Sequence, residues 1–595
     1  MKYGKKYMNI ENGLEKEWIL TNGIGGYASS TIIGANTRKY HGLLVAPLSP
    51  PARRFVVLSK LDESIEVNEK KYNIYTNIGK DYITEGYKNQ QNFEKTEIVI
   101  FNYEVENVKI KKSICMEYGK NTIVVNYNVK NSQASTKLIL APILNFRDFH
   151  GINKDHEFEI KQHIEDTKLK LIIDKNSEFP IYIKLSEGRY IEHKNDIFKN
   201  MFYIEEEKRG FEPEENHVVP GRFEVAIKPN EEKNITFVCS LEENIDEIDS
   251  KQIISKEKKR IKSLVRKSEL INEDNDEELI KNYIIASDNF IVNRPSFGLH
   301  TIIAGYPWFL DWGRDTLISF EGLLLIPKRY KEAKEVLLTI IRDVKYGLVP
   351  NGYSGFDNRP LYNSVDSSLL LFEQVKKYLQ YTNDEKFVKG KLYDILVKII
   401  YSYINGIDVD DNNIYMDDDY LIVSGTCDTQ NTWMDAKIEN YAVTPRNGKA
   451  VEINSLWYNA LKIMEEITNK YFGVKFAKPY ADLAKKCKKS FEEKFYQNRR
   501  KCLYDVIGDK KIRPNQLFAL ALSYPVLDCS SEKAKNVFST VTKKLLNSYG
   551  LKTLAKGEEN YVEVYEGDRF KRDLSYHQGI TWPWLLGIYN DAFKN

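Results

Sequence analysis

The chain has 595 residues, of which 42% are apolar and 29% are charged, and its net charge is +2. This length exceeds what one hydrophobic core usually supports, so more than one domain is expected. Basic and acidic runs lie side by side and mostly cancel, which leaves no overall field to attract nucleic acid.

Membrane, secretion and metal signals are missing from the sequence. The apolar stretch at 317–326 is interrupted by Glu321 and is far shorter than the ~20 residues of a membrane span. The N-terminus lacks the apolar core of a signal peptide. The eight histidines form no metal-binding motif, so no metal or other cofactor is expected. The six cysteines lack CxxC spacing, which predicts reduced thiols in a cytoplasmic protein; they are Cys115, Cys239, Cys427, Cys487, Cys502 and Cys529.

Aromatic residues make up 12% of the chain, and 39 of them are Tyr. Many of these rings stand next to Asp, Asn, Gly or Arg rather than inside apolar runs. A ring beside polar groups suits a ligand with flat apolar faces and hydroxyl edges, which is the character of a sugar. Ordinary core tyrosines would give the same bias, so the composition alone leaves both readings open.

The first part of the chain, 1–245, reads as β-structure. Short β-branched and aromatic runs recur between turn clusters, among them "TIVVNYNV", "TKLILAPIL", "FEVAIKP" and "NITFVCS". Regular short strands with turn signals predict a large antiparallel β-sandwich.

The rest of the chain reads as helical. Residues 246–280 are rich in charge and lack Pro and Gly, which predicts a helical linker. From 281 to 595, runs such as "YKEAKEVLLTIIRDV", "SSLLLFEQVKKYLQYT" and "INSLWYNALKIMEEITNKYF" carry apolar residues at helical spacing. Loops rich in rings and polar groups precede these helices. The helical runs are expected to begin at Asp315, Asp366, Glu452, Pro514 and His577, which are 51, 86, 62 and 63 residues apart. This rhythm predicts helical hairpins in a ring, with the loops gathered at one end.

At these motifs the sequence resembles a known family. Residues 17–46, "EWILTNGIGGYASSTIIGANTRKYHGLLVA", resemble the N-terminal domain of bacterial and archaeal glycogen debranching enzymes. The motifs "WFLDWGRDT", "YNSVDSSL", "TWMDAK", "AVEINSLWYNAL", "RPNQLFAL" and "YHQGITWPW" resemble, in order, those of the amylo-α-1,6-glucosidase domain of these enzymes. The resemblance implies a β-sandwich followed by an (α/α)6 barrel. It also implies a glycoside hydrolase that releases α-1,6-linked glucose from glycogen or another branched α-glucan, with no nucleic-acid or membrane partner and with no oligomeric state specified.

Hydrolysis of a glycosidic bond requires two carboxyl groups, which in an inverting enzyme lie roughly 6.5–9.5 Å apart. Asp435 in "TWMDAK" is the candidate general acid. Its apolar neighbours would raise its pKa, and the matching Asp is the general acid in related helical-barrel glycosidases. The alternative from the residues alone is that Asp435 caps a helix.

The general base is expected in the last loops. The eukaryotic relatives carry a glutamate inside the "YHQG" motif, where this chain has Ile580 and Thr581, so their base cannot be transferred. Asp573 is the first candidate and Glu566 the second, with Glu563 and Asp568 nearby and Glu452 as a further possibility. The alternative for each acid of this loop is an ion pair with Arg569 or Arg572.

The resemblance also implies a set of sugar contacts. Arg314 and Asp315 in "WGRDT" are expected on the hydroxyls of the terminal glucose, with Trp308 and Trp312 on its faces, and Asp315 could also cap the following helix. Asp366 and Glu452, which begin helices, are expected to line the same pocket; the alternative for each is an acid that serves the helix dipole alone. The pocket is also expected to contain Trp433, Tyr576, His577, Gln578 and Trp582.

Other readings remain open at this point. "NGIGGYASS" does not match a dinucleotide-binding fingerprint. Arg38 to Gly42 of "TRKYHG" could reach the barrel or form a turn of the sandwich. A glucoamylase-like exo-glucosidase, a glycoside phosphorylase of the same architecture and a non-catalytic glucan-binding protein are the alternative functions. Nothing in the first half resembles the (β/α)8 transferase domain of the eukaryotic enzyme.

Overall fold

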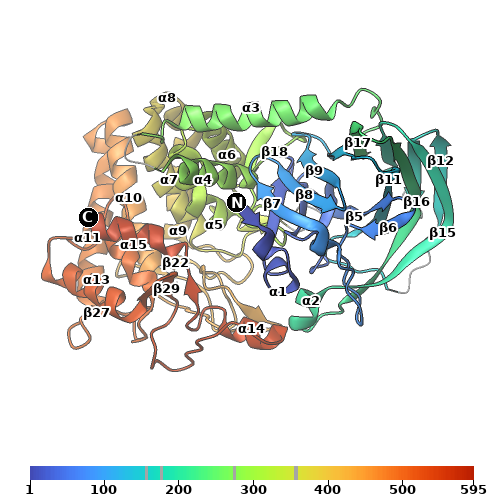
Figure 1. Cartoon of the computed structure of the whole chain (residues 1–595). Helices are drawn as coiled ribbons and strands as arrows, with labels where there is room; N and C mark the ends of the chain where they lie inside the picture. Colours follow the sequence, from blue (N-terminus) through green and yellow to red (C-terminus); the bar gives the residue numbers. More distant parts are fainter. Residues whose placement is uncertain (155–157, 174–177, 273–275, 354–358) are drawn as a thin grey trace. The chain divides into compact units, whose positions relative to one another are not determined.

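The chain divides into two compact units, Met1–Trp308 and Phe309–Asn595. The computed structural model in Figure 1 describes residues 1–154, 158–173, 178–272, 276–353 and 359–595. Residues 281–308, which the sequence reading assigned to the catalytic domain, are grouped with the first unit.

The first unit is built from two antiparallel sheets. One has the strand order β1-β7-β8-β9-β10-β17-β14-β13-β12, and the other has the order β15-β16-β11-β5-β4-β3-β2 with β6 beside β5. The strands of the first sheet are β1 (Lys2–Gly4), β7 (Gln90–Lys95), β8 (Val99–Val105), β9 (Val108–Met116), β10 (Thr122–Lys130), β17 (Glu232–Ser240), β14 (Ile181–Leu185), β13 (Lys168–Ile173) and β12 (Ile160–Glu165). Those of the second are β15 (Arg189–Phe202), β16 (Glu214–Ile227), β11 (Thr136–Asp148), β5 (Ala52–Val67), β4 (Gly42–Ser49), β3 (Tyr27–Thr31), β2 (Glu17–Thr21) and β6 (Lys70–Asn73). The β-branched runs picked out in the sequence fall in these strands.

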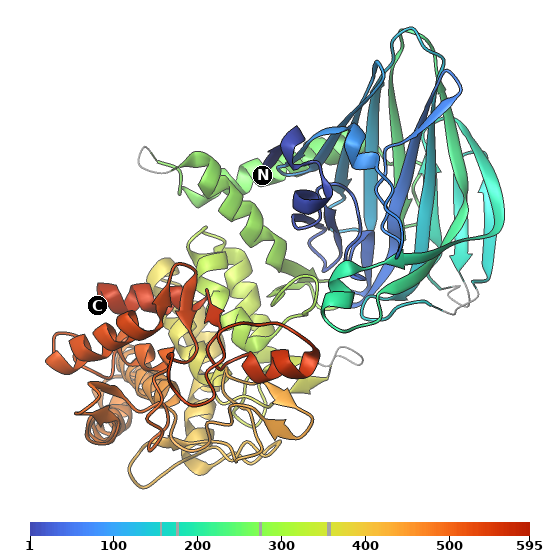
Figure 2. The same ribbon diagram turned by 60° about the horizontal axis from the view of Figure 1, so that its bottom comes forward.

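The two sheets face each other (Figure 2). Buried apolar side chains from both sheets form one core. Phe223 of β16 meets Phe237 of β17 with ring centroids 6.2 Å apart. Between the sheets, the Tyr127 hydroxyl of β10 donates to Glu63 Oε1 of β5 at 2.8 Å. Alternate residues of the strands supply this core because successive side chains point to opposite faces of a sheet.

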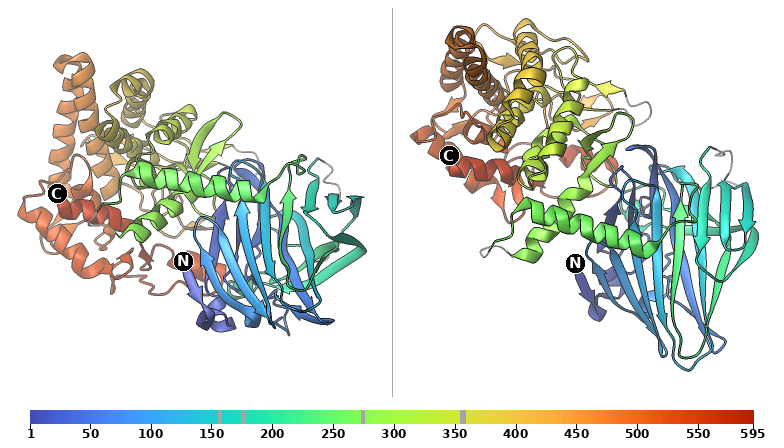
Figure 3. Two further views of the ribbon diagram at one scale, coloured as in Figure 1. Left: turned by 45° about the horizontal axis from the view of Figure 1, so that its top comes forward. Right: turned by 90° about the horizontal axis from the view of Figure 1, so that it is seen from above.

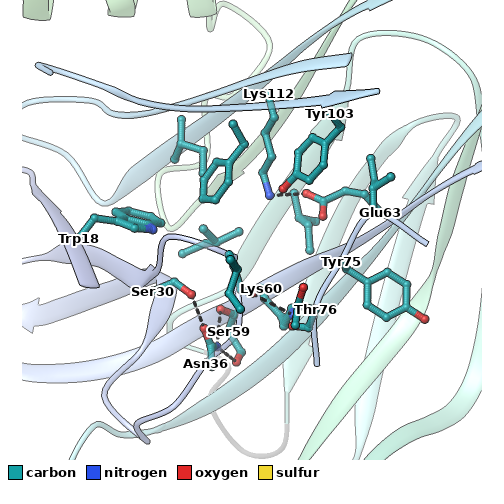
Figure 4. A pocket seen from close by; sticks show the side chains of 17 residues that line it. Trp18, Ser30, Asn36, Ser59, Lys60, Glu63, Tyr75, Thr76, Tyr103 and Lys112 are labelled. Atoms are coloured by element: carbon teal, nitrogen blue, oxygen red, sulfur yellow. Dashed lines mark hydrogen bonds and ion pairs between the residues drawn. The ribbon is translucent and has the colours of Figure 1, made fainter. Parts of the chain in front are cut away.

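A small cavity lined by both polar and apolar side chains lies inside this core (Figure 4). Lys112 forms an ion pair with Glu63, and the Lys60 ammonium donates to the Thr76 carbonyl oxygen at 2.7 Å. Burial lowers the pKa of Lys60, and neighbouring acids oppose that change. Because the charged groups have hydrogen-bond partners, they can remain between the sheets.

Two helices follow the sheets in the first unit, α3 (Ser250–Ser268) and α4 (Glu277–Phe290), shown in green in Figure 3. The Asp249 side chain caps α3 by accepting from the amides of residues 251 and 252, and Asp276 caps α4. Within the charge-rich segment at 246–280, residues 250–268 and 277–280 are therefore helical. Two short helices, α1 (Ile10–Gly13) and α2 (Ile204–Lys208), also belong to this unit.

The second unit is helical. Its helices are α5 (Gly313–Phe320), α6 (Tyr330–Arg342), α7 (Ser367–Thr382), α8 (Glu385–Phe387), α9 (Tyr393–Asn405), α10 (Val451–Phe472), α11 (Val474–Lys494), α12 (Phe518–Ala521), α13 (Glu532–Leu545), α14 (Arg569–Ser575) and α15 (Leu585–Lys594). Helix α10 packs on α7, α9, α11 and α12, and its first half is almost completely buried. Gly473, with φ of +94°, joins α10 to α11 in a helical hairpin.

The expected helix starts agree with the structure in part. Asp366 is the N-cap residue of α7, and Glu452 lies in the first turn of α10. Pro514 begins a 3₁₀ turn that leads into α12. The prediction at His577 was wrong, because this residue lies between α14 and α15. The turn there is followed by Pro583, which lacks an amide hydrogen and delays the last helix until Leu585.

Two general features bear on the expectations from composition. None of the helices within the described parts of the chain is both long and apolar enough to cross a membrane. The six cysteines, all of which lie in described segments, are not joined in disulfides.

Candidate active site

The "WGRD" turn begins α5, and close packing at two glycines fixes it. The Gly313 amide donates to the Asn351 carbonyl oxygen at 2.7 Å. A Cβ at Gly313 would lie 2.0 Å from the Pro350 carbonyl oxygen, so only glycine fits there. A Cβ at Gly352 would lie 3.1 Å from the Trp312 ring. The Trp312 ring is therefore laid directly over the backbone at Gly352, and it remains half-buried.

Arg314 is the centre of the site. Its Nε donates to both carboxylate oxygens of Asp366, at 2.9 and 2.8 Å, and its Nη1 donates to Asp435 Oδ2 at 2.7 Å. The Arg314 residue is only 5% exposed. Its Nη2 is buried and has no hydrogen-bond partner among the described residues. One guanidinium thus connects α5, the start of α7 and the "TWMD" segment, and it retains a donor for a ligand.

Asp435 lies in a loop, and the element that follows it is a short strand, β24 (Lys437–Ile438), not a helix. The alternative reading of Asp435 as a helix cap is therefore excluded. Its side chain is 31% exposed, yet protein crowds around the carboxyl group. This desolvation raises the pKa of Asp435 to about 6; Arg314 opposes the rise, and Asp315 and Asp366 add to it. The carboxyl group can therefore hold a proton near neutral pH, as a general acid must.

Asp315 is accessible to solvent beside this centre. It lies in the first turn of α5, whose N-cap residue is Trp312, so the expectation that Asp315 caps the helix was wrong. The helix begins at Gly313, two residues before the expected start at Asp315. Gly313 has no side chain, so the backbone there can pack closely against residues 350–351. Desolvation by the surrounding protein raises the pKa of Asp315, and Arg314 opposes the rise. An accessible acceptor next to a buried guanidinium suits the hydroxyls of a sugar.

Aromatic rings of the last loop surround Trp433. The ring centroid of Trp433 lies 5.3 Å from that of His577 and 6.1 Å from that of Trp582. Trp582 stacks on His577 and meets Tyr576 edge-on with centroids 5.0 Å apart. The expected residues Trp433, Tyr576, His577 and Trp582 are therefore brought together in one cluster. Trp433 and Met434 are anchored in a buried apolar cluster with Leu517.

The polar members of this cluster are uncharged near neutral pH. Burial lowers the pKa of His577 well below its usual value, with Arg513 and Arg314 adding to the effect, and its Nδ1 has no partner in the described chain. Burial raises the pKa of Tyr576 to about 12, and the carboxyl groups of Asp435 and Asp315 contribute. Gln578 Oε1 accepts from Arg513 Nη2 at 2.9 Å, so Gln578 is held in place by a protein partner.

The two leading base candidates differ in their surroundings. Asp573 lies on α14, is half-buried, and has one carboxylate oxygen 3.4 Å from Arg569 Nε. Helix α14 packs on β24, which begins two residues after Asp435. Glu566 is exposed in the preceding loop. Of the two nearby acids, Asp568 caps α14, and Glu563 is exposed and pairs with Lys552 and Lys556.

Comparison with known proteins places the chain in a family. The family model "Amylo-alpha-1,6-glucosidase" matches residues 285–595, and "Glycogen debranching enzyme N terminal" matches residues 16–234. The chain belongs to the amylo-alpha-1,6-glucosidase family. The family is one of debranching-type glycoside hydrolases. The glycogen debranching enzyme of Saccharomyces cerevisiae is 25% identical over 396 residues, which are 51% of this chain and 26% of that protein. The match thus spans about a quarter of the length of this curated relative.

Solved structures resemble the chain in fold. A bacterial glucoamylase in complex with acarbose aligns with a TM-score of 0.55 and 12% identity, over 99% of this chain and 85% of that one. A putative kojibiose phosphorylase from the human microbiome aligns with a TM-score of 0.42 and 11% identity, over 83% and 68% of the two chains. The glucoamylase alignment shows that this amylo-alpha-1,6-glucosidase family member shares a glucoamylase-like fold.

Two further expected residues of the family site lie in other surroundings. Trp308 ends the first unit, where its ring meets Tyr40 edge-on and lies near the guanidinium groups of Arg38 and Arg209. Glu452 is 1% exposed, and both of its carboxylate oxygens accept from Arg446.

Sequence reasoning did not single out Arg446, Asp505, Arg513 or Asn515, which form a buried polar cluster beside Trp433. Arg513 and Asn515 lie in the quoted motif "RPNQLFAL". The sequence signal for these two residues was the presence of polar side chains at the start of an apolar helical run.

Proposed function

We propose that the chain is an inverting exo-glucosidase that releases α-1,6-linked glucose from the branch points of a glycogen-type glucan. The single observation that carries this proposal is the geometry at Arg314, which joins Asp435 to Asp366 and leaves one donor unused. We further propose that the helices of the second unit form an (α/α)6 barrel, in which the loops bearing these residues meet at one end.

Asp435 acts as the general acid in this proposal. Its Oδ2 accepts from Arg314, so the proton is carried on Oδ1. As the bond between the anomeric carbon and the glycosidic oxygen breaks, the leaving oxygen takes this proton and departs as a hydroxyl. The raised pKa of about 6 supports this role, because a carboxyl group with an ordinary pKa would be almost fully ionised near neutral pH.

A second carboxylate removes a proton from the attacking water, which adds to the opposite face of the sugar. Asp573 remains the first candidate because α14 packs on the strand that follows Asp435. Its partner Arg569 is 78% exposed, so the ion pair is a weak competitor for the carboxylate. Glu566 is the second candidate.

The terminal glucose is held by polar contacts at its edge and by rings at its faces. Arg314 Nη2 donates to one hydroxyl, and Asp315 accepts from another. Trp312 provides an apolar face, while Tyr576 and Trp582 provide others on the last loop. We propose no sugar contact for Glu452, whose carboxylate is closed off by Arg446.

The described part of the first unit consists of antiparallel sheets, without the parallel strands and alternating helices of a (β/α)8 domain. We therefore propose that this chain performs the glucosidase step and not the maltooligosaccharide transfer. The unpaired cysteines suit a reducing cytoplasm, which is the location we propose.

The test of linkage uses two glucans in parallel. One carries single α-1,6-glucosyl stubs, and the other is a linear α-1,4-maltooligosaccharide. Release of free glucose at a much higher kcat/KM from the stubbed glucan supports the proposal. Release from the linear glucan alone would move the assignment to a glucoamylase-like enzyme. Binding of both glucans without release of glucose would identify a glucan-binding protein, and release of glucose 1-phosphate only when phosphate is added would identify a phosphorylase.

A further inference from the structure

A buried ionic cluster lies in the second unit, apart from the residues already given a catalytic role. Arg446 Nε donates to Asp505 Oδ2 at 2.6 Å, and its Nη2 donates to Glu452 Oε2 at 2.6 Å. Arg513 lies beside them, with its Nε 3.6 Å from Asp505 Oδ2. All four side chains are at most 2% exposed. Two cations and two anions balance, so the cluster can be buried without an uncompensated charge.

Asn515 connects this cluster to the segment that carries the proposed acid. Its Nδ2 donates to Asp505 Oδ1 at 2.8 Å, and its Oδ1 accepts from Trp433 Nε1 at 2.7 Å. Asn515 is fully buried in the 3₁₀ turn Pro514–Leu517. Both halves of one amide are therefore occupied, and the ring of Trp433 has a fixed orientation two residues before Asp435.

The neighbours of Trp433 are held by the same cluster. Thr432 Oγ1 accepts from Arg446 Nη1 at 3.3 Å. Met434 Sδ lies 3.7 Å from Arg513 Nη1 and also 3.7 Å from Asn515 Nδ2, which are weak contacts to a thioether acceptor. Each of the residues 432–434 thus contacts the cluster. On the other side of the segment, Asp435 is bound by Arg314, so the carboxyl group is restrained from both directions.

We propose that Asp505 and Asn515 are positioning residues for the reaction: they fix the Trp433 ring and thereby place the Asp435 carboxyl group against the leaving oxygen. This inference depends on the proposed role of Asp435 as general acid. Neither residue touches the reacting atoms, because both are buried behind Trp433 and Met434. A displacement of the acid by about 1 Å is enough to cost on the order of 100-fold in rate.

A purely structural role for the cluster predicts a different outcome. Loss of a buried amide would then lower stability and reduce the turnover of every substrate in the same proportion. A positioning role affects only the step that requires the acid. In α-glucosyl fluoride the bond between the anomeric carbon and fluorine breaks, water adds to the carbon, the base takes the proton of that water, and fluoride departs without being protonated. This substrate therefore needs the base but not the acid.

The experiment measures kcat for the stubbed glucan and for α-glucosyl fluoride in the full chain. Asn515→Leu removes the link at one end. Trp433→Phe removes the indole donor at the other end, keeps an aromatic ring in place, and serves if Asn515→Leu does not fold. We expect each to lose about 10–100-fold on the glucan and less than about threefold on the fluoride. The double variant should lose no more activity on the glucan than the worse single variant, because both changes break the same hydrogen bond between Trp433 and Asn515.

The matched control is Asn459→Leu. Asn459 is an equally buried asparagine of α10 that donates to Glu373 and accepts from the Tyr524 amide, without any link to Trp433. Asn459→Leu should lose about as much stability as Asn515→Leu, and it should keep the wild-type ratio of activities on the two substrates. An equal loss on both substrates in Asn515→Leu and Trp433→Phe, or a selective loss in Asn459→Leu, would overturn the positioning role.

Asp435→Asn separates this inference from the function on which it depends. As the acid, Asp435 should show the strongest selective loss on the glucan. If Asp435→Asn shows that selectivity and the Asn515 and Trp433 variants do not, only the positioning role fails. If Asp435→Asn retains activity on the glucan, or if the wild type does not hydrolyse the fluoride, the proposed function itself fails.

Discussion

Asp366 is the N-cap residue of α7, but its carboxylate makes no cap hydrogen bond: both oxygens accept from Arg314 Nε. A position that usually serves the helix amides is here used to orient a guanidinium. Because Nε is held in this way, Nη1 points to Asp435 and Nη2 remains for a ligand.

Arg314→Lys tests this arrangement. Lysine keeps the positive charge but is a point donor, so it cannot bind Asp366 and Asp435 in fixed directions and also donate to a sugar. We expect kcat/KM on the stubbed glucan to fall by about 10²–10³-fold, the range for loss of one preorganised donor. Arg329→Lys is the matched control, since Arg329 is also buried and pairs with a carboxylate, Glu332. Activity within about twofold of wild type in Arg314→Lys would contradict the central role of Arg314.

The dependence of activity on pH follows from Asp435. Its pKa is raised to about 6, and the acid works only in its protonated form, so kcat/KM should fall as the pH rises through about 6. The negative charge of Asp315 contributes to that rise. Asp315→Asn should therefore move the alkaline limb to lower pH, whereas Asp528→Asn, a change at an exposed loop residue, should leave it in place. A shift of the limb to higher pH in Asp315→Asn would contradict this electrostatic account.

The base can be identified by chemical rescue. A small anion such as azide can occupy the place of the attacking water and needs no base, so it should restore turnover only where the base has been removed. We expect Asp573→Asn to lose about 10²–10⁴-fold in kcat and to recover with azide, with β-glucosyl azide as the product. Rescue of Glu566→Gln in place of Asp573→Asn would assign the base to Glu566.

Gly313→Ala tests the close approach that starts α5. A methyl group there would lie 2.0 Å from the Pro350 carbonyl oxygen, so the backbone must shift. We expect the free energy of unfolding to fall by about 1–3 kcal/mol, as in overpacked cores. Gly322→Ala is the control, because a Cβ at Gly322 meets nothing within 4 Å. Alanine there should be neutral or stabilising by up to about 1 kcal/mol. Urea denaturation of both variants measures the difference, and equal stabilities would contradict the packing argument.

The sequence predicted the elements better than the contacts. Strand and helix periodicity located β10, β11, α7 and α10, because each of these elements buries most of its apolar residues in a core. The family motifs brought Asp435, Arg314 and Asp366 into consideration, and the structure places them in one hydrogen-bonded group.

What the sequence could not predict depends on distant segments. Glu452 begins a helix as expected, but its partner Arg446 lies in the preceding loop, and Asp505 joins them from a later one. Nothing in the local pattern distinguishes such a buried bridge from a substrate contact, since both place an acid at a helix N-terminus. For the same reason, sequence spacing does not choose between Asp573 and Glu566 as the base, because burial and partners from other segments distinguish them.

The most direct test of the central claim is time-resolved proton NMR of glucose released from the glucan with α-1,6-glucosyl stubs, with wild type and Asp435→Asn side by side. An inverting glucosidase with Asp435 as acid predicts β-glucose as the first anomer, and a loss of about 10²–10⁴-fold in its rate of appearance in Asp435→Asn. First appearance of α-glucose, or an undiminished rate in the variant, would contradict the claim.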